Sequence, residues 1–360
     1  MTIATGHEAH VSLPLADDDH EQIVIRQDKE TGLRLIVAVH STVLGPALGG
    51  MRLKRYPGGL REALEDVMGL ARTMTLKASA AGLDLGGGKA VMIDDGDEPM
   101  RTTRLEAAAR VVDSLDGAYI TAEDIGTTTA DMDQMGRVTR FVVGQSVANG
   151  GGGDPSPVTA ETVFQAMRRG LAAATGSGDL DGRRVGVVGL GKVGSALAKK
   201  LAEWGAHVIG CDLEMERCQC LAEAHGISIA PSAEAILASE LDVLAPCAAG
   251  GLIDEALARS IDCRVVAGAA NNPLTDRGVA RTLMEREIVC VPDFLANCGG
   301  LIHVSMEWYG EHGASEQQLI AGAMARLDSA LATAEADGVP PIDVAERQAL
   351  ERVEAAHASR

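Results

Sequence analysis

Residues 184–194 read Arg-Val-Gly-Val-Val-Gly-Leu-Gly-Lys-Val-Gly, and Gly189, Gly191 and Gly194 have GxGxxG spacing. The stretch follows an apolar run and precedes a helical run at 195–203. Glycines in this context permit a tight turn, close approach of the backbone to a pyrophosphate, and close packing of helix on strand. The first N–H groups of the helix also favour an anion. The stretch therefore predicts a dinucleotide-binding loop in a Rossmann domain.

Asp212 ends the next apolar run, residues 207–212, at the point where a carboxylate can accept hydrogen bonds from the adenosine ribose. A carboxylate there would repel the 2′-phosphate of NADP, so the sequence predicts NAD. Arg217, five residues later, is a feature that would favour NADP. The alternative to a dinucleotide site is a plain glycine turn followed by an incidental aspartate. The loop positions predicted to bind the cofactor are Gly189, Leu190, Gly191, Lys192, Val193 and Gly194.

Apolar runs alternate with helical stretches after residue 155, which predicts a doubly wound parallel sheet. The runs lie at 185–189, 207–211, 242–246, 264–268 and 288–292. From 316 onward the composition favours two helices with a break at 338–341. We expect the last of them to pack back on the N-terminal part of the chain.

The N-terminal part predicts a mixed α/β sheet. A hairpin is expected at 22–40, strands at 90–93 and 118–121, and an amphipathic helix at 60–74 that ends just before Lys77. Asn149-Gly-Gly-Gly-Gly-Asp154 predicts an inter-domain hinge. The expected domains are therefore a substrate-binding and catalytic domain at 1–148, joined by the helix at about 340–360, and a Rossmann domain at 149–330, with a cleft between them.

Composition narrows the class of protein. The chain has 360 residues, 46% of them hydrophobic, which suits two domains. Its formal net charge of −19 gives no electrostatic reason to bind nucleic acid. Without a signal sequence or a long apolar run, we expect a cytoplasmic protein with no membrane partner. Seven scattered cysteines fit reduced thiols, and their spacing predicts no metal site.

Two further stretches are hard to explain as packing and are expected to form active-site loops: Gly45-Pro-Ala-Leu-Gly-Gly-Met-Arg52 and residues 77–89. The second ends in Gly-Gly-Gly-Lys89, and an apolar strand follows. A lysine there would be partly desolvated, which favours the neutral amine and makes Lys89 a candidate base.

At this point the chain closely resembles the glutamate/leucine/phenylalanine/valine dehydrogenase family. The resemblance rests on GPALGGMR, LKASAAGLDLGGGKAV, TAEDIGTT, DPSPVTA, GVVGLGKVG, GAANNPL and NCGGLIHV, which occur in family order along nearly the whole chain. It implies NAD-dependent, reversible oxidative deamination of an L-amino acid to a 2-oxo acid and ammonia. It also implies a homo-oligomer and, among the family's members, a place near the valine dehydrogenases.

The resemblance implies the catalytic roles. Lys77 would grip the substrate carboxylate, although a solvated lysine at a helix end is the alternative. Lys89 would activate water, with its pKa lowered by burial and by the charge of Lys77. Asp124 would receive protons from the amino group, and the adjacent Glu123 is expected to point to the opposite side.

Further positions follow from the same resemblance. Gly49, Gly50 and Asn272 would contact the substrate, with Asn271 as a less favoured substitute for Asn272, and the Asn-Asn-Pro segment could instead be a plain turn. The positions expected to approach the nicotinamide end are Thr159 and Asn297.

The substrate side chain would meet four apolar residues, Leu48, Ala122, Leu301 and Val304. Burying the distal carboxylate of glutamate against them would cost several kcal/mol, so glutamate is disfavoured. The volume of these residues favours valine, with partial selectivity over leucine and isoleucine. A phenylalanine dehydrogenase is the runner-up, because of Leu301. A non-catalytic NAD-binding protein is the alternative from another class.

Overall fold

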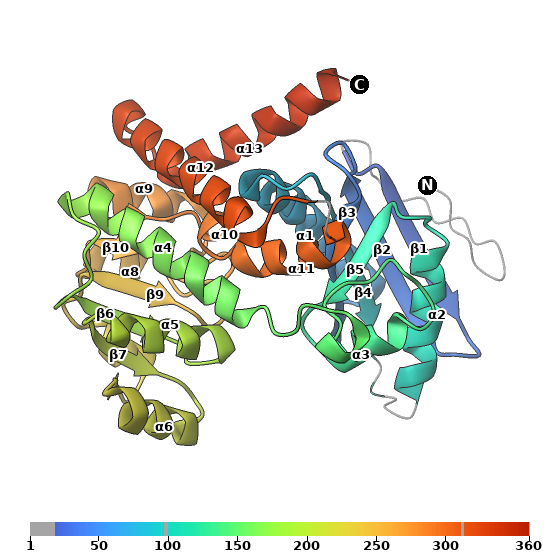
Figure 1. Ribbon diagram of the computed structural model, residues 1–360, viewed down its shortest axis with the longest axis horizontal. Coiled ribbons are helices and arrows are strands. Elements are labelled where there is room, and N and C mark those ends of the chain that lie inside the picture. Colours follow the sequence, from blue (N-terminus) through green and yellow to red (C-terminus); the bar gives the residue numbers. More distant parts are fainter. Residues whose placement is uncertain (1–18, 95, 97–99, 311–312, 360) are drawn as a thin grey trace. The chain divides into compact units, whose positions relative to one another are not determined.

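The computed structural model describes residues 19–94, 96, 100–310 and 313–359 (Figure 1). The chain divides into two compact units. The first comprises Met1–Asp154, Val304–Gly313 and Leu350–Arg360, and the second comprises Pro155–His303 and Ala314–Ala349. The first junction lies between Asp154 and Pro155, a few residues after the expected boundary at 148, and each unit is described separately below.

The first unit contains a five-stranded sheet in the order β1-β2-β4-β3-β5. β1 and β2 form the expected hairpin, β2 is antiparallel to β4, and β3 runs parallel to both β4 and β5, so the sheet is mixed as predicted. The strands are β1 Gln22–Asp28, β2 Leu33–Ser41, β3 Ala47–Lys54, β4 Gly86–Ile93 and β5 Tyr119–Glu123.

Helices cover both faces of this sheet. Alternate residues of β2 enter different cores, because successive side chains of a strand point to opposite faces. Ile36 packs with Leu64 and Val67 of α1, whereas Leu35 packs with Leu105 of α2. The helices of this part of the chain are α1 Gly59–Ala81, α2 Arg101–Asp113, α3 Thr129–Met135 and the 3-10 turn η2 Val147–Asn149.

The structure corrects three local expectations. Helix α1 does not end before Lys77 but continues to Ala81, because Ala and Ser there permit helix and Gly82 caps it in the left-handed conformation at φ 78°. The stretch at 45–52 is mostly strand β3 and not a loop. The glycines at 86–88 likewise belong to strand β4, where close neighbours leave no room for side chains.

The second unit contains a six-stranded sheet in the order β11-β10-β9-β6-β7-β8, and every registered pair in it is parallel. Numbered within the unit, this is the 3-2-1-4-5-6 order of a Rossmann fold, as expected. The two-residue strand β8 was not anticipated. The strands are β6 Arg184–Val188, β7 His207–Cys211, β8 Ser228–Ile229, β9 Val243–Pro246, β10 Val265–Val266 and β11 Val289–Cys290.

Ten further helices complete the described chain, and two of them are divided between the units. α11 changes unit after His303, and α13 changes unit after Ala349. Within the first unit, Arg352 of α13 donates to the Leu83 carbonyl and to Asp84, each over 2.8 Å. The helices are α4 Ser156–Thr175, α5 Lys192–Glu203, α6 Met215–His225, α7 Ala233–Leu237, α8 Glu255–Ser260, α9 Arg277–Glu285, α10 Asp293–Ala296, α11 Gly299–Tyr309, α12 Glu316–Asp337 and α13 Pro341–Ala358.

All seven cysteines are free thiols, and all belong to the second unit. Cys220 is exposed, Cys247 is half-buried, and the remaining five are buried. Among the described residues, no helix is long and apolar enough to cross a membrane. Nor do His, Cys, Asp and Glu side chains gather anywhere in this part of the chain in a group that could hold a metal ion.

Candidate active site

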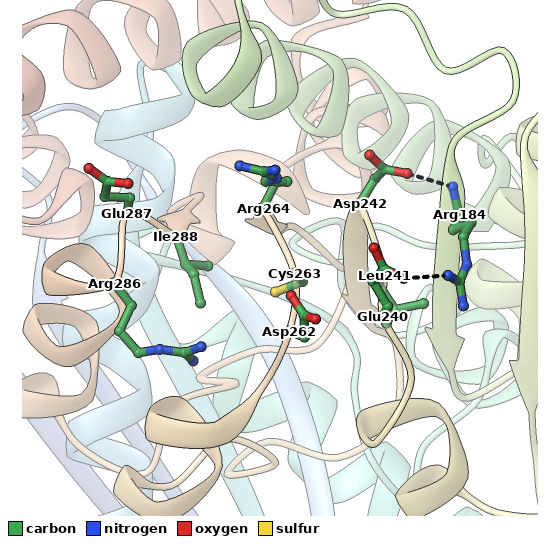
Figure 2. A pocket seen from close by; sticks show the side chains of 10 residues that line it. All are labelled: Arg184, Glu240, Leu241, Asp242, Asp262, Cys263, Arg264, Arg286, Glu287 and Ile288. Atoms are coloured by element: carbon green, nitrogen blue, oxygen red, sulfur yellow. Dashed lines mark hydrogen bonds and ion pairs between the residues drawn. The ribbon is translucent and has the colours of Figure 1, made fainter.

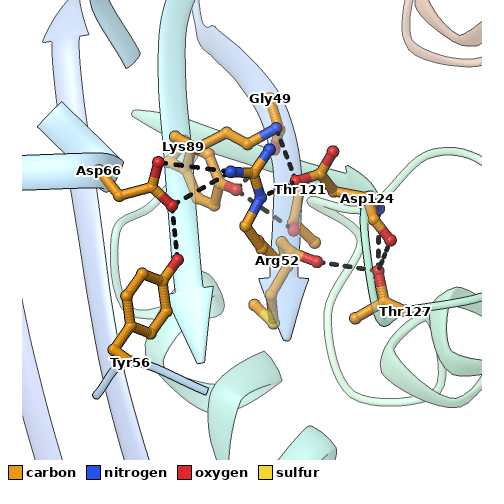
Figure 3. A network of polar contacts seen from close by, with 10 residues as sticks. Gly49, Arg52, Tyr56, Asp66, Lys89, Thr121, Asp124 and Thr127 are labelled. Carbon is orange, nitrogen blue, oxygen red and sulfur yellow. Dashed lines mark hydrogen bonds and ion pairs between the residues drawn. The ribbon is translucent and has the colours of Figure 1, made fainter. Parts of the chain in front are cut away.

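Lys89 and Asp124 form an ion pair in the first unit (Figure 3). Lys89 projects from β4 and Asp124 follows β5, the two strands that flank β3. The Lys89 Nζ lies 3.2 Å from Asp124 Oδ2, and the two side chains are 7% and 20% exposed. The structure thus brings together the two residues that the sequence assigned to acid–base chemistry.

Burial and charge set the protonation of this pair. Desolvation lowers the pKa of Lys89, and the charge of Arg52 lowers it further, although Asp124 opposes both effects. Burial alone would raise the pKa of Asp124, but Lys89 and Arg52 outweigh it and hold that pKa below its usual value. The site therefore favours an ionised Asp124 beside a lysine that gives up its proton more readily than usual. Arg52 is a nearby cation that the sequence did not suggest.

Arg52 was not assigned a role from the sequence, although it ends the quoted 45–52 motif. Its Nε donates to Asp124 Oδ2 over 2.8 Å, and its Nη1 donates to Asp66 Oδ2 of α1 over 3.1 Å. The Tyr56 hydroxyl donates to the same Asp66 oxygen over 2.5 Å. The role of Arg52 follows from its burial and from its two acidic partners, Asp66 and Asp124. Neither feature can be read from a single sequence.

The backbone of Asp124 is anchored by Thr127. The Asp124 N–H donates to the Thr127 hydroxyl over 2.9 Å, and that hydroxyl donates to the Met51 carbonyl of β3 over 2.8 Å. The neighbouring Glu123 accepts a hydrogen bond from Thr129 instead. The two acids therefore have separate partners, in keeping with the expectation that they point apart.

Gly49 and Gly50 are glycines because β3 is closely packed between its neighbours. A Cβ on Gly49 would lie 1.8 Å from the Gly88 carbonyl oxygen, and one on Gly50 would lie 2.5 Å from the Glu123 carbonyl oxygen and 2.8 Å from Asp124 Cβ. The buried Tyr119 hydroxyl also donates to the Gly49 carbonyl over 2.5 Å. These glycines thus fix the spacing of the strands that carry Lys89 and Asp124.

Lys77 is half-buried in the last turns of α1. Two residues earlier on the helix, Thr75 lies against Gly87 of β4: a Cβ on Gly87 would be 2.1 Å from the Thr75 nitrogen. The glycines of β4 therefore let the end of α1 approach the strand that carries Lys89. This places Lys77 on an element in direct contact with that strand.

The glycine-rich loop of the second unit fits a dinucleotide. Gly189 adopts φ +100°, and a Cβ there would lie 2.8 Å from Ala248. A Cβ on Gly194 would lie 2.0 Å from the Gly189 carbonyl oxygen, so this glycine lets α5 approach the loop. Gly191, the N-cap of α5, has open space around its Cα, where phosphate oxygens can approach the helix N-terminus. Lys192 and Val193 begin that helix.

Asp212 follows β7 and is joined to this loop. Its carboxylate accepts hydrogen bonds from the Leu190 N–H over 2.7 Å and from the Glu214 N–H over 3.0 Å. These bonds and Arg217, 3.7 Å away, hold its pKa below the usual range although partial burial opposes them. Leu190 is fully buried, so it supports the loop from within. An ionised Asp212 would repel a 2′-phosphate.

The remaining predicted residues of the second unit gather near the carboxyl ends of β10 and β11. Asn297 is buried and donates to the Ala269 carbonyl and to Asn271 Oδ1, while its own Oδ1 has no hydrogen-bond partner within the described chain. Thr159 lies beside Gly300, where a Cβ would be 2.8 Å from its hydroxyl. This unpartnered buried oxygen and the hydroxyl are groups that a carboxamide could meet.

Asn272 is exposed and adopts the left-handed φ of 48°. Its N–H donates to Asp293 Oδ2 over 2.8 Å, which stabilises that conformation. The Asn271 side chain is engaged with Asn297, whereas no hydrogen bond involves the Asn272 side chain in the described chain. The Asn271 side-chain oxygen is therefore already engaged by Asn297, whereas both polar atoms of the Asn272 side chain can meet a ligand.

Comparisons with known proteins agree with this arrangement. Residues 19–140 match the Glu/Leu/Phe/Val dehydrogenase dimerisation domain, and residues 211–360 match the Glutamate/Leucine/Phenylalanine/Valine dehydrogenase family. Residues 160–249 also match the NAD binding domain of D-isomer specific 2-hydroxyacid dehydrogenases.

A valine dehydrogenase from Streptomyces albus is 41% identical over the whole of both chains. A leucine dehydrogenase from Thermoactinomyces intermedius is 40% identical, over 93% of this chain and 91% of its own. The chain belongs to the glutamate/leucine/phenylalanine/valine dehydrogenase family. The crystal structure of the L-tryptophan dehydrogenase from Nostoc punctiforme superposes with a TM-score of 0.83 at 30% identity, over 96% of this chain and 98% of that one.

Family membership makes the protein an amino acid dehydrogenase with NAD as its cofactor. The four residues expected to contact the substrate side chain of this dehydrogenase are all buried. Leu48 lies in β3 and Ala122 in β5, while Leu301 and Val304 lie on α11 on either side of the point where that helix changes unit. Each is apolar, so none can meet a charged side chain.

The Rossmann unit of the dehydrogenase also contains a cavity that none of the predicted site residues lines (Figure 2). It encloses about 340 Å³ beside the residues that begin β6, β9, β10 and β11, at the opposite end of the strands from the glycine-rich loop. Its arginines have mixed surroundings: Arg184 pairs with Glu240, and Arg286 donates to the carbonyls of Ala258 and Ile261. The acids among its lining residues are Glu240, Asp242, Asp262 and Glu287.

Proposed function

We propose that the protein catalyses the reversible oxidative deamination of a branched-chain aliphatic L-amino acid to the 2-oxo acid, ammonia and NADH, with valine as the preferred substrate and leucine and isoleucine also accepted. The buried contact between Lys89 and Asp124 carries the proposal. A lysine whose pKa is lowered beside a carboxylate that stays ionised is the pair that water addition to an imine requires.

Different residues of the chain carry out the separate steps of the reaction. NAD, held by the glycine-rich loop and Asp212, would supply the acceptor for the hydride that leaves the substrate α-carbon. Lys77 holds the substrate carboxylate as a compact cation, and the Asn272 amide orients the α-carbon. Neutral Lys89 then takes a proton from water as its oxygen attacks the imine carbon.

Asp124 handles the protons on nitrogen. Its ionised carboxylate accepts a proton from the substrate ammonium before hydride transfer. It returns a proton to the amino group of the tetrahedral adduct, whose carbon–nitrogen bond then breaks. Lys89 passes the proton it took from water to the ionised Asp124, 3.2 Å away, and then takes the hydroxyl proton as the carbon–nitrogen bond breaks. The products are the 2-oxo acid and ammonia, and the two protons left on Lys89 and Asp124 go to solvent.

Four buried apolar residues support an aliphatic substrate. Leaving the distal carboxylate of glutamate unpaired against Leu48 and Ala122 would cost several kcal/mol, so acidic substrates are excluded. Among apolar side chains, one methylene is worth only about 1 to 3 kcal/mol, so selectivity is graded. The similar identities to a valine and a leucine dehydrogenase fit such a graded preference.

Initial rates with NAD on valine, leucine, isoleucine, phenylalanine and glutamate test the proposal. We expect the highest kcat/KM on valine, lower values on leucine and isoleucine, and none on glutamate. A large advantage for phenylalanine would replace the branched-chain assignment by the aromatic one. Absence of NADH formation with every amino acid would leave a NAD-binding protein without turnover.

We also expect copies of the chain to associate, since its residues 19–140 match a domain described as a dimerisation domain. Sedimentation of the purified chain would measure the oligomeric state. A monomer at assay concentrations would contradict this expectation.

A further inference from the structure

We propose that Arg52 is a positioning residue for deamination: its guanidinium orients the Asp124 carboxylate so that one oxygen is bound by Lys89 and the other is left for the substrate amino group. This inference rests on the proposed function. It concerns how the catalytic pair is held and charged, and it lies entirely within the first unit.

One guanidinium joins three elements of that unit. Arg52 lies near the end of β3. Its Nε binds Asp124, which follows β5, and its Nη1 binds Asp66 of α1 (Figure 3). Asp66 is itself held by the Tyr56 hydroxyl. A planar fork with fixed donor directions can hold both acids at once, which the point charge of a lysine cannot do.

The two oxygens of Asp124 are thereby made different. Oδ2 receives the Arg52 Nε at 2.8 Å and faces the Lys89 Nζ at 3.2 Å. Oδ1 accepts no hydrogen bond within the described ranges 19–94, 96, 100–310 and 313–359. With Oδ2 occupied, the carboxylate cannot rotate without breaking the Arg52 bond. Oδ1 is therefore the oxygen that can receive a proton from a substrate ammonium.

Arg52 also acts on both titrating groups with the same sign. Its charge lowers the pKa of Lys89 and the pKa of Asp124. Both effects favour the state that deamination needs, a neutral lysine beside an ionised aspartate. Asp66 opposes the first effect, because its negative charge raises the pKa of Lys89. The two partners should consequently shift the pH dependence in opposite directions.

The test measures kcat for the preferred amino acid against pH in Arg52→Gln, Arg52→Lys and Asp66→Asn. Arg52→Gln should lower kcat roughly 100-fold, because misplacing a reacting group costs this much. It should also move the acidic limb of the kcat profile to higher pH. Arg52→Lys keeps the charge and should leave that limb close to the parent's, with kcat only partly restored.

Asp66→Asn should move the acidic limb to lower pH, because it removes the negative charge that raises the pKa of Lys89. A merely structural role for the network predicts lower thermal stability in all three variants without limb shifts of opposite sign. If Arg52→Gln does not fold, the other two variants still distinguish a positioning role from a merely structural one. The proposal requires a lower kcat in Arg52→Lys and an acidic limb at lower pH in Asp66→Asn.

Arg183→Gln is the matched control. Arg183 is a half-buried arginine of the second unit that is bound to Asp242 over 2.9 Å and has no assigned role in the site, so its replacement should leave kcat and the pH profile unchanged. Lys89→Ala separates the two levels of inference. If Lys89→Ala is inactive while Arg52→Gln keeps the parental kcat and the parental acidic limb of the pH profile, only the role of Arg52 is overturned. If Lys89→Ala is active, the proposed chemistry itself is overturned.

Discussion

The Asp212 carboxylate accepts a hydrogen bond from the Leu190 N–H over 2.7 Å, and this bond ties the end of β7 to the glycine-rich loop after β6. Asp212 therefore has a structural task before any cofactor binds, since it holds the loop that precedes α5. The same ionised carboxylate carries the negative charge that opposes a 2′-phosphate.

Asp212→Ala should weaken NAD binding without changing the chemical step. A hydrogen bond to a charged group contributes about 1.5 to 3 kcal/mol, so we expect the KM for NAD to rise roughly 10- to 100-fold. The ratio of rates with NADP and NAD should also increase. Asp254→Ala, which removes the N-cap carboxylate of α8 in the same unit, should lower Tm and leave KM unaltered. A parental KM for NAD in Asp212→Ala would contradict the assignment.

Lys89→Ala should remove the base while leaving the cofactor domain intact. General acid–base catalysis contributes about 10²- to 10⁴-fold, so kcat should fall by roughly 10³-fold. Affinity for NADH, measured by fluorescence titration, should stay close to the parent's because Lys89 belongs to the other unit. Retention of most of the activity would show that another group activates water.

The pH dependence should differ in sign between the two directions of the reaction. Deamination needs neutral Lys89, so its kcat should rise with pH through a pKa below the ordinary lysine value. Amination uses the protonated lysine as the acid, so its kcat should fall as pH rises through the same group. Parallel pH profiles in both directions would exclude Lys89 as the shared group.

Lys89→Met should raise Tm at neutral pH while it abolishes activity. Burial lowers the pKa of Lys89 in the fold relative to the unfolded chain, so the charged lysine costs stability at and below neutral pH. Parental stability recovers as pH rises toward the unfolded lysine pKa of about 10.4, and the advantage of methionine should shrink over that range. Melting curves of both proteins across this pH range measure the difference in Tm. A lower Tm in Lys89→Met at neutral pH would show that the ion pair between Lys89 and Asp124 outweighs the cost of burying the lysine.

Gly49→Ala should destabilise the fold, because its Cβ would lie 1.8 Å from the Gly88 carbonyl oxygen between two paired strands. Overpacking of this kind costs about 3 kcal/mol. Gly69→Ala is the matched control: it lies in α1 with open space around it, and alanine there should stabilise the helix by about 0.5 to 1 kcal/mol. Denaturant unfolding compares the two, and equal midpoints would contradict the packing argument.

The Rossmann half could be predicted because each longer strand is an apolar run and the glycines mark the first turn. β8, Ser228–Ile229, was missed because it is an edge strand with an exposed serine and no apolar run marks it. The equally short β10 and β11 lie within apolar runs of the sequence. In the first unit the glycines at 86–88 suggested a loop, but contacts with Thr75 and Tyr119 place them in a strand, where tertiary packing overrides propensity.

The candidate site could be predicted only as separate residues. Lys89 and Asp124 were assigned through motifs, and strand pairing brings them together. The Arg52 bond to Asp124 spans 72 positions, and no local pattern specifies it. Asp66 reads in the sequence as one more polar residue on an amphipathic helix, and only the fold shows that it faces Arg52.

The placement of the cysteines allows the two units to be labelled separately with thiol-reactive dyes. A thiolate is the species that maleimides attack, and burial raises the pKa of Cys247 to about 11 and those of Cys263 and Cys290 to about 12, so these thiols stay protonated at neutral pH. Cys220 on α6 is exposed and accepts a dye first. Because the first unit has no cysteine, one introduced there takes a second dye, and energy transfer between the two dyes measures whether the distance between the units changes when NAD and substrate are added.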